Sequence, residues 1–115
     1  MLKVKEQDIV RGILDYLNLR KITHAHVRNT GSIIQRGGKT FFGKARHSQP
    51  GVADILGVYR GIAIAIEVKS LVGRLRPDQE QWLMSWSKNG GAYCVARSIE
   101  NVEQFLASLE VKNGN

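Results

Sequence analysis

Apolar side chains recur at helical spacing near both ends of the chain. Between residues 5 and 18 they fall three or four positions apart, with charged residues between them, which predicts an amphipathic helix. A similar pattern follows Ser98, a residue type that caps helices, and predicts a final helix. The two apolar faces consist of Ile9, Val10, Ile13, Leu14 and Leu17 in the first helix and Ile99, Val102, Phe105, Leu106 and Leu109 in the last.

The middle of the chain has the alternation that is typical of β-strands. Residues 52–59 and 62–69 are rich in β-forming residues and are separated only by Arg60-Gly61, which predicts a hairpin at the centre of a sheet. In the second run, bulky residues at one set of alternate positions share one face. The other face carries Ala63, Ala65, Glu67 and Lys69. We therefore expect both faces to be covered.

The remaining segments complete an α/β pattern. From Ala25 to Ser48 the chain is polar and basic, and its turn signals around SIIQ and TFFG predict a loose hairpin or a pair of loops. After a basic loop from Leu71 to Arg76, Pro77 suits the first position of a helix that runs to about Lys88 and ends at Gly90-Gly91. AYCVA is a further strand, parallel to residues 62–69 through a right-handed crossover. We predict one domain over residues 1–115, a mixed sheet flanked by helices.

Composition narrows the classes of protein to which the chain can belong. Apolar residues make up 43% of the 115 residues, which argues against disorder. Seventeen Lys and Arg against ten Asp and Glu give a net charge of +7, which attracts nucleic acid, although a basic domain without that role is an alternative. A single cysteine, Cys94, excludes an intrachain disulfide, and the charged N-terminus has no signal peptide or membrane span. We expect a reducing, cytosolic setting.

The hairpin brings candidate catalytic residues together. If Arg60 and Gly61 form a two-residue turn, counting back along both strands pairs Asp54 with Glu67. Two opposed carboxylates repel each other unless a cation lies between them, and oxygen ligands suit Mg²⁺ or Mn²⁺. Lys69 shares this face and can position an attacking water or offset charge on a phosphate. The alternative is an ordinary strand, since E-x-K alone is common.

Two further polar residues fall on apolar helix faces. Glu6 precedes Val10 by four positions, so it continues the face of the first helix and could complete a metal site; the alternative is a first-turn Glu favoured by the helix dipole. Gln79 falls on the buried side of the helix that starts at Pro77. A buried amide needs partners, which a phosphate, a water or a backbone group can supply.

Several of these residues, in their order along the chain, resemble the motifs of a known protein family. They are Glu6, Gly51-Val52-Ala53-Asp54, Glu67-Val68-Lys69 and Gln79-Glu80-Gln81-Trp82-Leu83. Over nearly the whole chain the arrangement resembles the PD-(D/E)xK nuclease superfamily and, within it, the virus-type replication-repair (VRR-NUC) nuclease domain. One departure is Ala53, which stands where the family has a proline.

The resemblance implies a restriction-endonuclease-like αβββαβ core and hydrolysis of DNA phosphodiesters with Mg²⁺ or Mn²⁺. It implies that Asp54, Glu67 and the backbone carbonyl of Val68 bind the metal, that Lys69 aids the attacking water, and that Glu6 and Gln79 are accessory catalytic residues. Stand-alone members look like dimeric Holliday-junction resolvases, so we expect a homodimer in the cytoplasm of a bacterial or phage-infected cell. The alternatives are a flap- or end-directed nuclease subunit of a repair or packaging machine, and a non-catalytic nucleic-acid-binding module.

The basic loops are the predicted DNA-binding surface of such a nuclease. We expect phosphate contacts from Arg28, Arg36, Lys39, Lys44, Arg46, Arg74 and Arg76, against the alternative of a solvated surface. His24, His26 and His47 have no ligand spacing, so we expect phosphate contacts or surface positions for them. We expect Trp82, Trp86, Phe105 and Cys94 in the core. The apolar segment from Ile33 to Phe42 is a candidate dimer surface.

Overall fold

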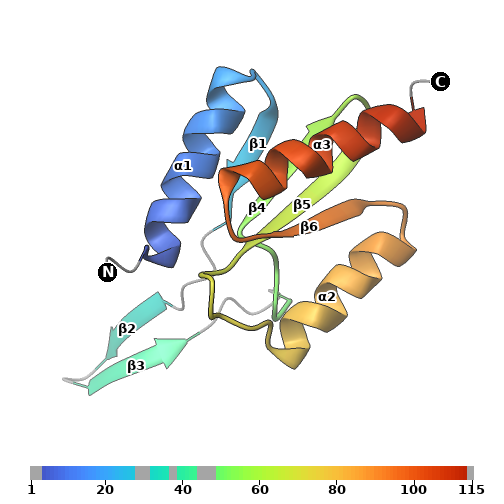
Figure 1. Ribbon diagram of the computed structural model, residues 1–115. Coiled ribbons are helices and arrows are strands. Elements are labelled where there is room, and N and C mark those ends of the chain that lie inside the picture. The colour runs from blue at the N-terminus through green and yellow to red at the C-terminus, as the bar shows by residue number, and fades with distance from the viewer. Residues whose placement is uncertain (1–3, 28–31, 37–38, 44–48, 114–115) are drawn as a thin grey trace.

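The fold was examined in a computed structural model, which describes residues 4–27, 32–36, 39–43 and 49–113 (Figure 1). Its elements are α1 (Glu6–Leu19), β1 (Thr23–His26), β2 (Ser32–Arg36), β3 (Lys39–Gly43), β4 (Ile55–Tyr59), β5 (Ile62–Val68), α2 (Pro77–Lys88), β6 (Ala92–Ala96) and α3 (Ile99–Asn113). Among these helices, none is long and apolar enough to cross a membrane.

In the described part of the chain, four strands form one mixed sheet in the order β1-β4-β5-β6. β1 and β5 each pair antiparallel with β4, whereas β6 pairs parallel with β5. The parallel pair is joined through α2, as the sequence predicts. Together α1, β1, β4, β5, α2 and β6 give the αβββαβ order, and the α/β fold with a mixed sheet between helices is confirmed.

The β4–β5 turn sets the register of the sheet. Arg60 and Gly61 have φ angles of 51° and 82°, as a two-residue turn with both central residues in the left-handed region requires. Tyr59 therefore faces Ile62, and five consecutive pairs follow, ending at Ile55 and Ile66. The predicted hairpin and its register are confirmed.

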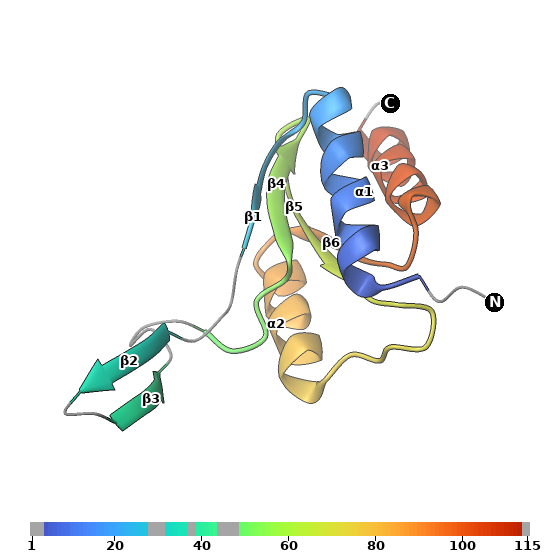
Figure 2. The ribbon, with the colours of Figure 1, turned by 90° about the vertical axis from the view of Figure 1, so that its left-hand side faces the viewer.

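Helices cover both faces of the sheet (Figure 2). α1 and α3 lie on one face, where Ile64, Ile66 and Val68 belong to the larger hydrophobic core. α2 covers part of the other face, where Leu83 packs with Ala65 in a smaller cluster. The small residues of β5 thus face α2, although Ala63 stays exposed beyond the helix.

One prediction for the segment after Ala25 is wrong. Ala25 and His26 are not in a loop but in β1, which forms the edge of the main sheet beside β4. Within β1 only His24 is partly buried and the other three residues are exposed, so the sequence of this strand has no alternation of apolar and polar residues that would predict it. The hairpin predicted around SIIQ and TFFG is confirmed as β2 and β3, which pair with each other and extend away from the main sheet (Figures 1 and 2).

Candidate active site

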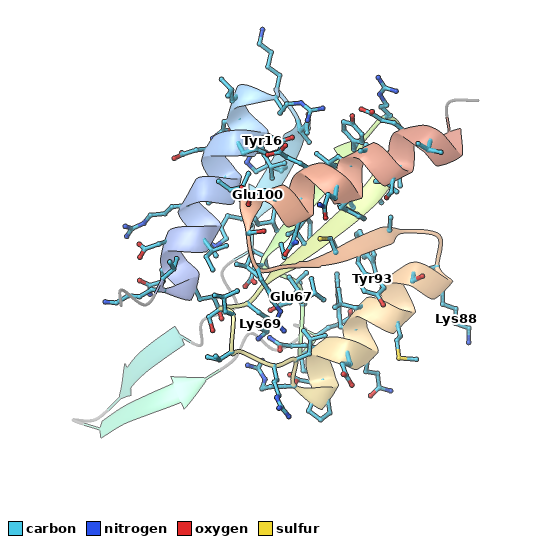
Figure 3. The ribbon with its side chains drawn as sticks, viewed as in Figure 1. Tyr16, Glu67, Lys69, Lys88, Tyr93 and Glu100 are labelled. Carbon is cyan, nitrogen blue, oxygen red and sulfur yellow. The ribbon has the colours of Figure 1, made fainter. Side chains whose placement is uncertain are left out.

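A cavity of about 720 Å³ opens where β4 begins and β5 ends. Its lining combines the first half of α1, the ends of β1 and β5, and the start of α2. Glu67 and Lys69 lie together at this end of the sheet, between α1 and α2 (Figure 3). The residues of this lining that the sequence singles out are Glu6, His26, Asp54, Glu67, Lys69, Arg76 and Gln79.

Asp54 stands immediately before β4, opposite Glu67. Ile55 pairs with Ile66, so the same register continued by one residue places the two carboxylates across from each other. The backbone N–H of Val68 donates to Asp54 Oδ2 at 2.7 Å, and the N–H of Val27 donates to the Asp54 carbonyl at 2.7 Å. Asp54 is therefore held from both neighbouring strands, and the predicted pairing is present.

Glu67 is the most deeply buried acid of the site, with 2% of its surface exposed. Its Oε2 atom accepts a hydrogen bond from Gln79 Nε2 at 3.1 Å and lies 3.6 Å from Lys69 Nζ. Its Oε1 atom is buried and has no hydrogen-bond partner among the described residues. A buried carboxylate oxygen without a partner is costly, which indicates a place for a further group.

The charge state of Glu67 reflects this setting. Burial, and then the neighbouring charge of Asp54, raise the pKa of Glu67 to about 8, although Lys69 acts in the opposite direction. Near neutral pH and without a cation, the carboxyl group of Glu67 therefore holds its proton, which it can share with the neighbouring carboxylate of Asp54. The oxygen without a partner is thus a feature of the ionised form. A divalent cation would replace that proton, because it stabilises the ionised form of both carboxylates.

Gln79 is positioned by the first turn of α2. Its Oε1 accepts the backbone N–H of Arg76 at 2.9 Å, which completes a capping box at the start of the helix, and its Nε2 is left to reach Glu67. Gly51 allows this approach: it has φ of 79°, and a Cβ there would lie 2.3 Å from the Asp78 carbonyl oxygen. The glycine before the strand thus brings α2 close to the carboxylates.

The donor set fits Mg²⁺ or Mn²⁺. It offers two opposed carboxylates, one of which has a buried oxygen without a partner, and no thiolate or imidazole is needed to complete it. Asp54, Glu67 and the Val68 carbonyl would hold the ion. Within the described residues, no group of three His, Cys, Asp or Glu side chains is arranged to hold a metal. The fit therefore depends on the two acids and a backbone oxygen.

A polar cluster at the opposite end of β4 shows the contrast. The Tyr59 hydroxyl donates to Glu110 and accepts a bond from Arg20 Nη2 at 3.3 Å, and Arg20 also bonds Tyr16, which is labelled in Figure 3. Each of these groups has a partner, as a structural cluster requires. Glu67 Oε1 does not, which sets the cavity apart.

The other predicted residues lie at varying distances from this centre. Glu6 lines the cavity but is exposed, so its predicted inward position is wrong: it begins α1, one turn before the first buried residue, Ile9. Arg76 also lines the cavity and forms an ion pair with Asp78 at 3.2 Å, whereas Arg74 is exposed on the adjoining loop. The roles of all three stay predictions.

The basic residues of the middle segment lie largely beyond what the structure describes. Arg28, Lys44, Arg46 and His47 fall outside the described residues. Arg36 and Lys39 pair with each other next to the turn of the β2–β3 hairpin, at its outer end (Figure 1). Their contact with DNA stays a prediction.

Trp82, Trp86, Phe105 and Cys94, which the sequence places in the core, are partly buried and pack against its two clusters. Trp82 and Trp86 stack with ring centroids 5.1 Å apart and pack on the cluster under α2, and Phe105 packs on the larger core. Burial raises the pKa of the Cys94 thiol to about 11, so the thiol stays protonated. His26 is the residue that sequence reasoning undervalued: it lines the cavity because β1 lies beside β4.

In comparisons with known proteins, no family model matches the chain, and no curated protein matches it either.

Proposed function

We propose that this protein is a metal-dependent DNA endonuclease of the PD-(D/E)xK type, similar to VRR-NUC domains, that hydrolyses phosphodiester bonds with Mg²⁺ or Mn²⁺. The observation that carries the proposal is the buried carboxylate of Glu67, which lies opposite Asp54 and beside Lys69 and has one oxygen without a partner among the residues that the structure describes. A net charge of +7 supports DNA as the substrate. The cytoplasm, where a lone thiol stays reduced, is the proposed location.

Each residue has a defined task in this proposal. Asp54 and Glu67 hold the cation, which would neutralise the carboxylates, polarise the phosphate and lower the pKa of water. Gln79 fixes the orientation of Glu67 through its 3.1 Å hydrogen bond. Lys69 places a positive charge where the attacked phosphate gains negative charge. A water oxygen bonds to phosphorus as the bond to the leaving sugar oxygen breaks. The attacking water loses one proton and the leaving sugar oxygen gains one, so the net reaction adds one water across the P–O bond.

A non-catalytic DNA-binding module is the alternative from another class. Such a module needs exposed basic residues but gains nothing from a buried acid, which repels phosphate and costs free energy to bury. The arrangement of Glu67, Lys69 and Gln79 therefore favours catalysis over binding alone.

We infer further that the substrate is branched DNA, such as a Holliday junction, and that the enzyme is a homodimer. The residues that the structure describes form one such centre, and two symmetric nicks in a junction need two centres related by a two-fold axis. The register of the β2–β3 hairpin supports this, because it pairs large apolar residues with each other: Ile33 with Phe42 and Ile34 with Phe41. An isolated two-stranded hairpin is marginally stable without a partner surface.

The direct test is a cleavage assay on linear, flapped and four-way DNA, with Mg²⁺, with Mn²⁺ and with a chelator. The proposal expects paired nicks in opposing strands of the junction, and only with metal. A protein that binds all of these DNAs but cuts none would be a binding module. Cleavage of flaps or free ends alone would retain the nuclease and favour the second alternative, a subunit of a larger machine.

Light scattering tests the dimer separately. A homodimer has about twice the mass of the 12.8 kDa chain. Replacing Ile34 and Phe41 together by Ser should give a monomer that no longer makes paired nicks. A wild-type chain that stays monomeric at assay concentration while cutting junctions would contradict the dimer and leave the nuclease proposal standing.

A further inference from the structure

A tight turn with an apolar tip follows the last residue of the candidate site. Ser70 and Gly73 close the turn, since the Gly73 N–H lies 3.1 Å from both the carbonyl and the hydroxyl oxygen of Ser70. Leu71 and Val72 occupy its apex with 79% and 87% of their surface exposed. Two adjacent aliphatic side chains thus project into solvent at one point.

The side chain of Arg97 holds the turn in place. Its Nη1 atom donates to the carbonyl oxygens of both Ser70 and Gly73, the latter at 2.7 Å, so one guanidinium holds both ends of the turn. Further along, Leu75 packs on the cluster under α2. Leu75 shows that an aliphatic side chain of this loop can be buried. Leu71 and Val72, by contrast, are exposed to solvent.

The turn lies between two residues that line the cavity, Lys69 and Arg76, and its neighbours in the sequence are basic. Leu71 is two residues beyond Lys69, so their Cα atoms are at most about 7 Å apart. A Cβ on Gly73 would lie 3.6 Å from the Lys69 side chain, which passes beneath the turn. Residues 68–77 contain Lys69, Arg74 and Arg76 and no acid. The apolar tip is thus flanked by charges that would hold phosphates.

We propose that Leu71 and Val72 form a wedge that enters an opened base step next to the phosphate being cut. This inference rests on the proposed nuclease function and adds the feature of DNA that the site selects. Proteins that bend or open DNA insert aliphatic side chains of this kind between bases, while neighbouring basic residues hold the backbone. The wedge is rigid because Arg97 fixes the turn, so little conformational entropy is lost on insertion.

The wedge gives a physical reason for a preference for branched DNA. Opening a base step in a continuous duplex breaks the stacking of two base pairs and so costs free energy. At a branch point the stack is already interrupted, so the same insertion costs less. An enzyme with this tip would therefore cut near branches faster than within a duplex, without reading the sequence of the bases.

The test replaces both tip residues with Ser, in a double variant Leu71→Ser with Val72→Ser. Cleavage of a four-way junction should fall about ten- to a hundredfold, because the burial of two aliphatic side chains is lost. On a junction with one unpaired nucleotide at the cut site, where no step needs opening, the loss should shrink to about twofold. The apolar variant Leu71→Met with Val72→Ile should keep wild-type rates on both DNAs.

The matched control places the same change far from the cavity. Leu19 and Val111 are each 82% exposed, so Leu19→Ser with Val111→Ser removes similar apolar surface without touching the turn. A second readout is the fluorescence of 2-aminopurine at the branch, bound to protein that also carries Asp54→Asn. Its fluorescence should rise with an intact tip and stay low with the Ser tip.

The outcomes separate the two proposals. If the wild-type protein cuts no DNA with Mg²⁺ or Mn²⁺, the nuclease function itself fails. If it cuts junctions and the Ser tip cuts them equally fast, only the wedge fails. If the Ser tip turns a dimer into a monomer in light scattering, the apolar tip binds a second copy of the chain and the wedge is again wrong.

Discussion

The two faces of β5 differ in what they bury. On the side of α1 and α3, Ile64, Ile66 and Val68 are fully covered by other apolar side chains. On the side of α2, the same strand carries Ala65 and then Glu67, which is also buried but has no partner for one oxygen within the described part of the chain. One strand thus combines a face that stabilises the fold with a face that costs stability.

The apolar face makes the acidic one possible. Burying an Ile side chain contributes about 1.5 to 3 kcal/mol, which offsets the cost of holding an acid out of water on the other side. A site on a rigid central strand also keeps its geometry better than a site on a loop. Four predictions follow from this difference between the two faces. Three concern the acidic residues and Lys69, and one concerns the apolar face.

The largest effect is expected from the acidic face. Asp54→Asn or Glu67→Gln should lower the rate of DNA cleavage by at least about a thousandfold, because each removes a charge that would hold the proposed cation. Binding of DNA should persist, since loss of a carboxylate also removes repulsion with phosphate. Cleavage rates and fluorescence anisotropy measure the two properties.

Asp15→Asn provides the matched control for these changes, because Asp15 is exposed on the outer side of α1. It should leave both properties unaltered. A Glu67→Gln protein that cuts DNA at the wild-type rate would show that the site has been assigned to the wrong residues.

The next effect concerns Lys69. Lys69→Ala should slow cleavage about a hundred- to a thousandfold, the loss expected when one group that stabilises developing charge is removed. Calorimetric titration should still show Mn²⁺ binding, because both acids remain. Lys88→Ala, at an exposed position of α2, is the control. Loss of Mn²⁺ binding in Lys69→Ala would instead indicate that the lysine supports the structure of the site.

A third, smaller effect is the pH dependence of stability without metal. The pKa of Glu67 in the folded chain is about 8, above the value of about 4.5 for an unperturbed carboxyl, so folding favours the protonated form. Stability from this group is complete below about pH 4.5 and is lost as the pH rises toward 8 and beyond. Between pH 6 and 9 the loss is on the order of 2 to 3 kcal/mol.

Thermal unfolding at several pH values measures this loss. The wild-type midpoint should fall between pH 6 and 9 in a chelator, and Mn²⁺ should restore it. Glu67→Gln, which resembles the protonated state, should show a flatter profile and exceed the wild type at pH 9. Parallel profiles for the two proteins would mean that Glu67 is ionised throughout.

Much of this site can be predicted from the sequence because one turn determines it. Arg60-Gly61 specifies a two-residue hairpin, the register follows by counting, and Asp54 must then oppose Glu67. Gln79 can be placed on the buried side of α2 from helical spacing alone. These positions depend on local chemistry, which a sequence displays directly.

Other features depend on contacts between distant segments. β1 is recognisable only through its pairing with β4, since THAH has no apolar alternation, and His26 joins the cavity for that reason. Position 51 requires glycine because the carbonyl group of Asp78 approaches it closely. The turn that starts at Ser70 is held by Arg97, which follows it in the chain by a whole helix and a strand. Glu6 fits the apolar periodicity of its helix, yet it is the first residue of α1 and is exposed.

The smallest expected effect comes from a single methyl group on the apolar face. Ile64→Val should lower the free energy of unfolding by about 1 kcal/mol, because it leaves a small cavity among the side chains under α1 and α3. Val58→Ala, at a half-exposed position of β4, should cost less and serves as the control. Denaturant titration measures both. Ile64 and Glu67 point to opposite sides of β5, so Ile64→Val should cut DNA at the wild-type rate at temperatures where it is folded. A tenfold slower rate in the folded variant would show that packing on the apolar face controls the position of Glu67, and the two faces would then have to be treated as one coupled unit.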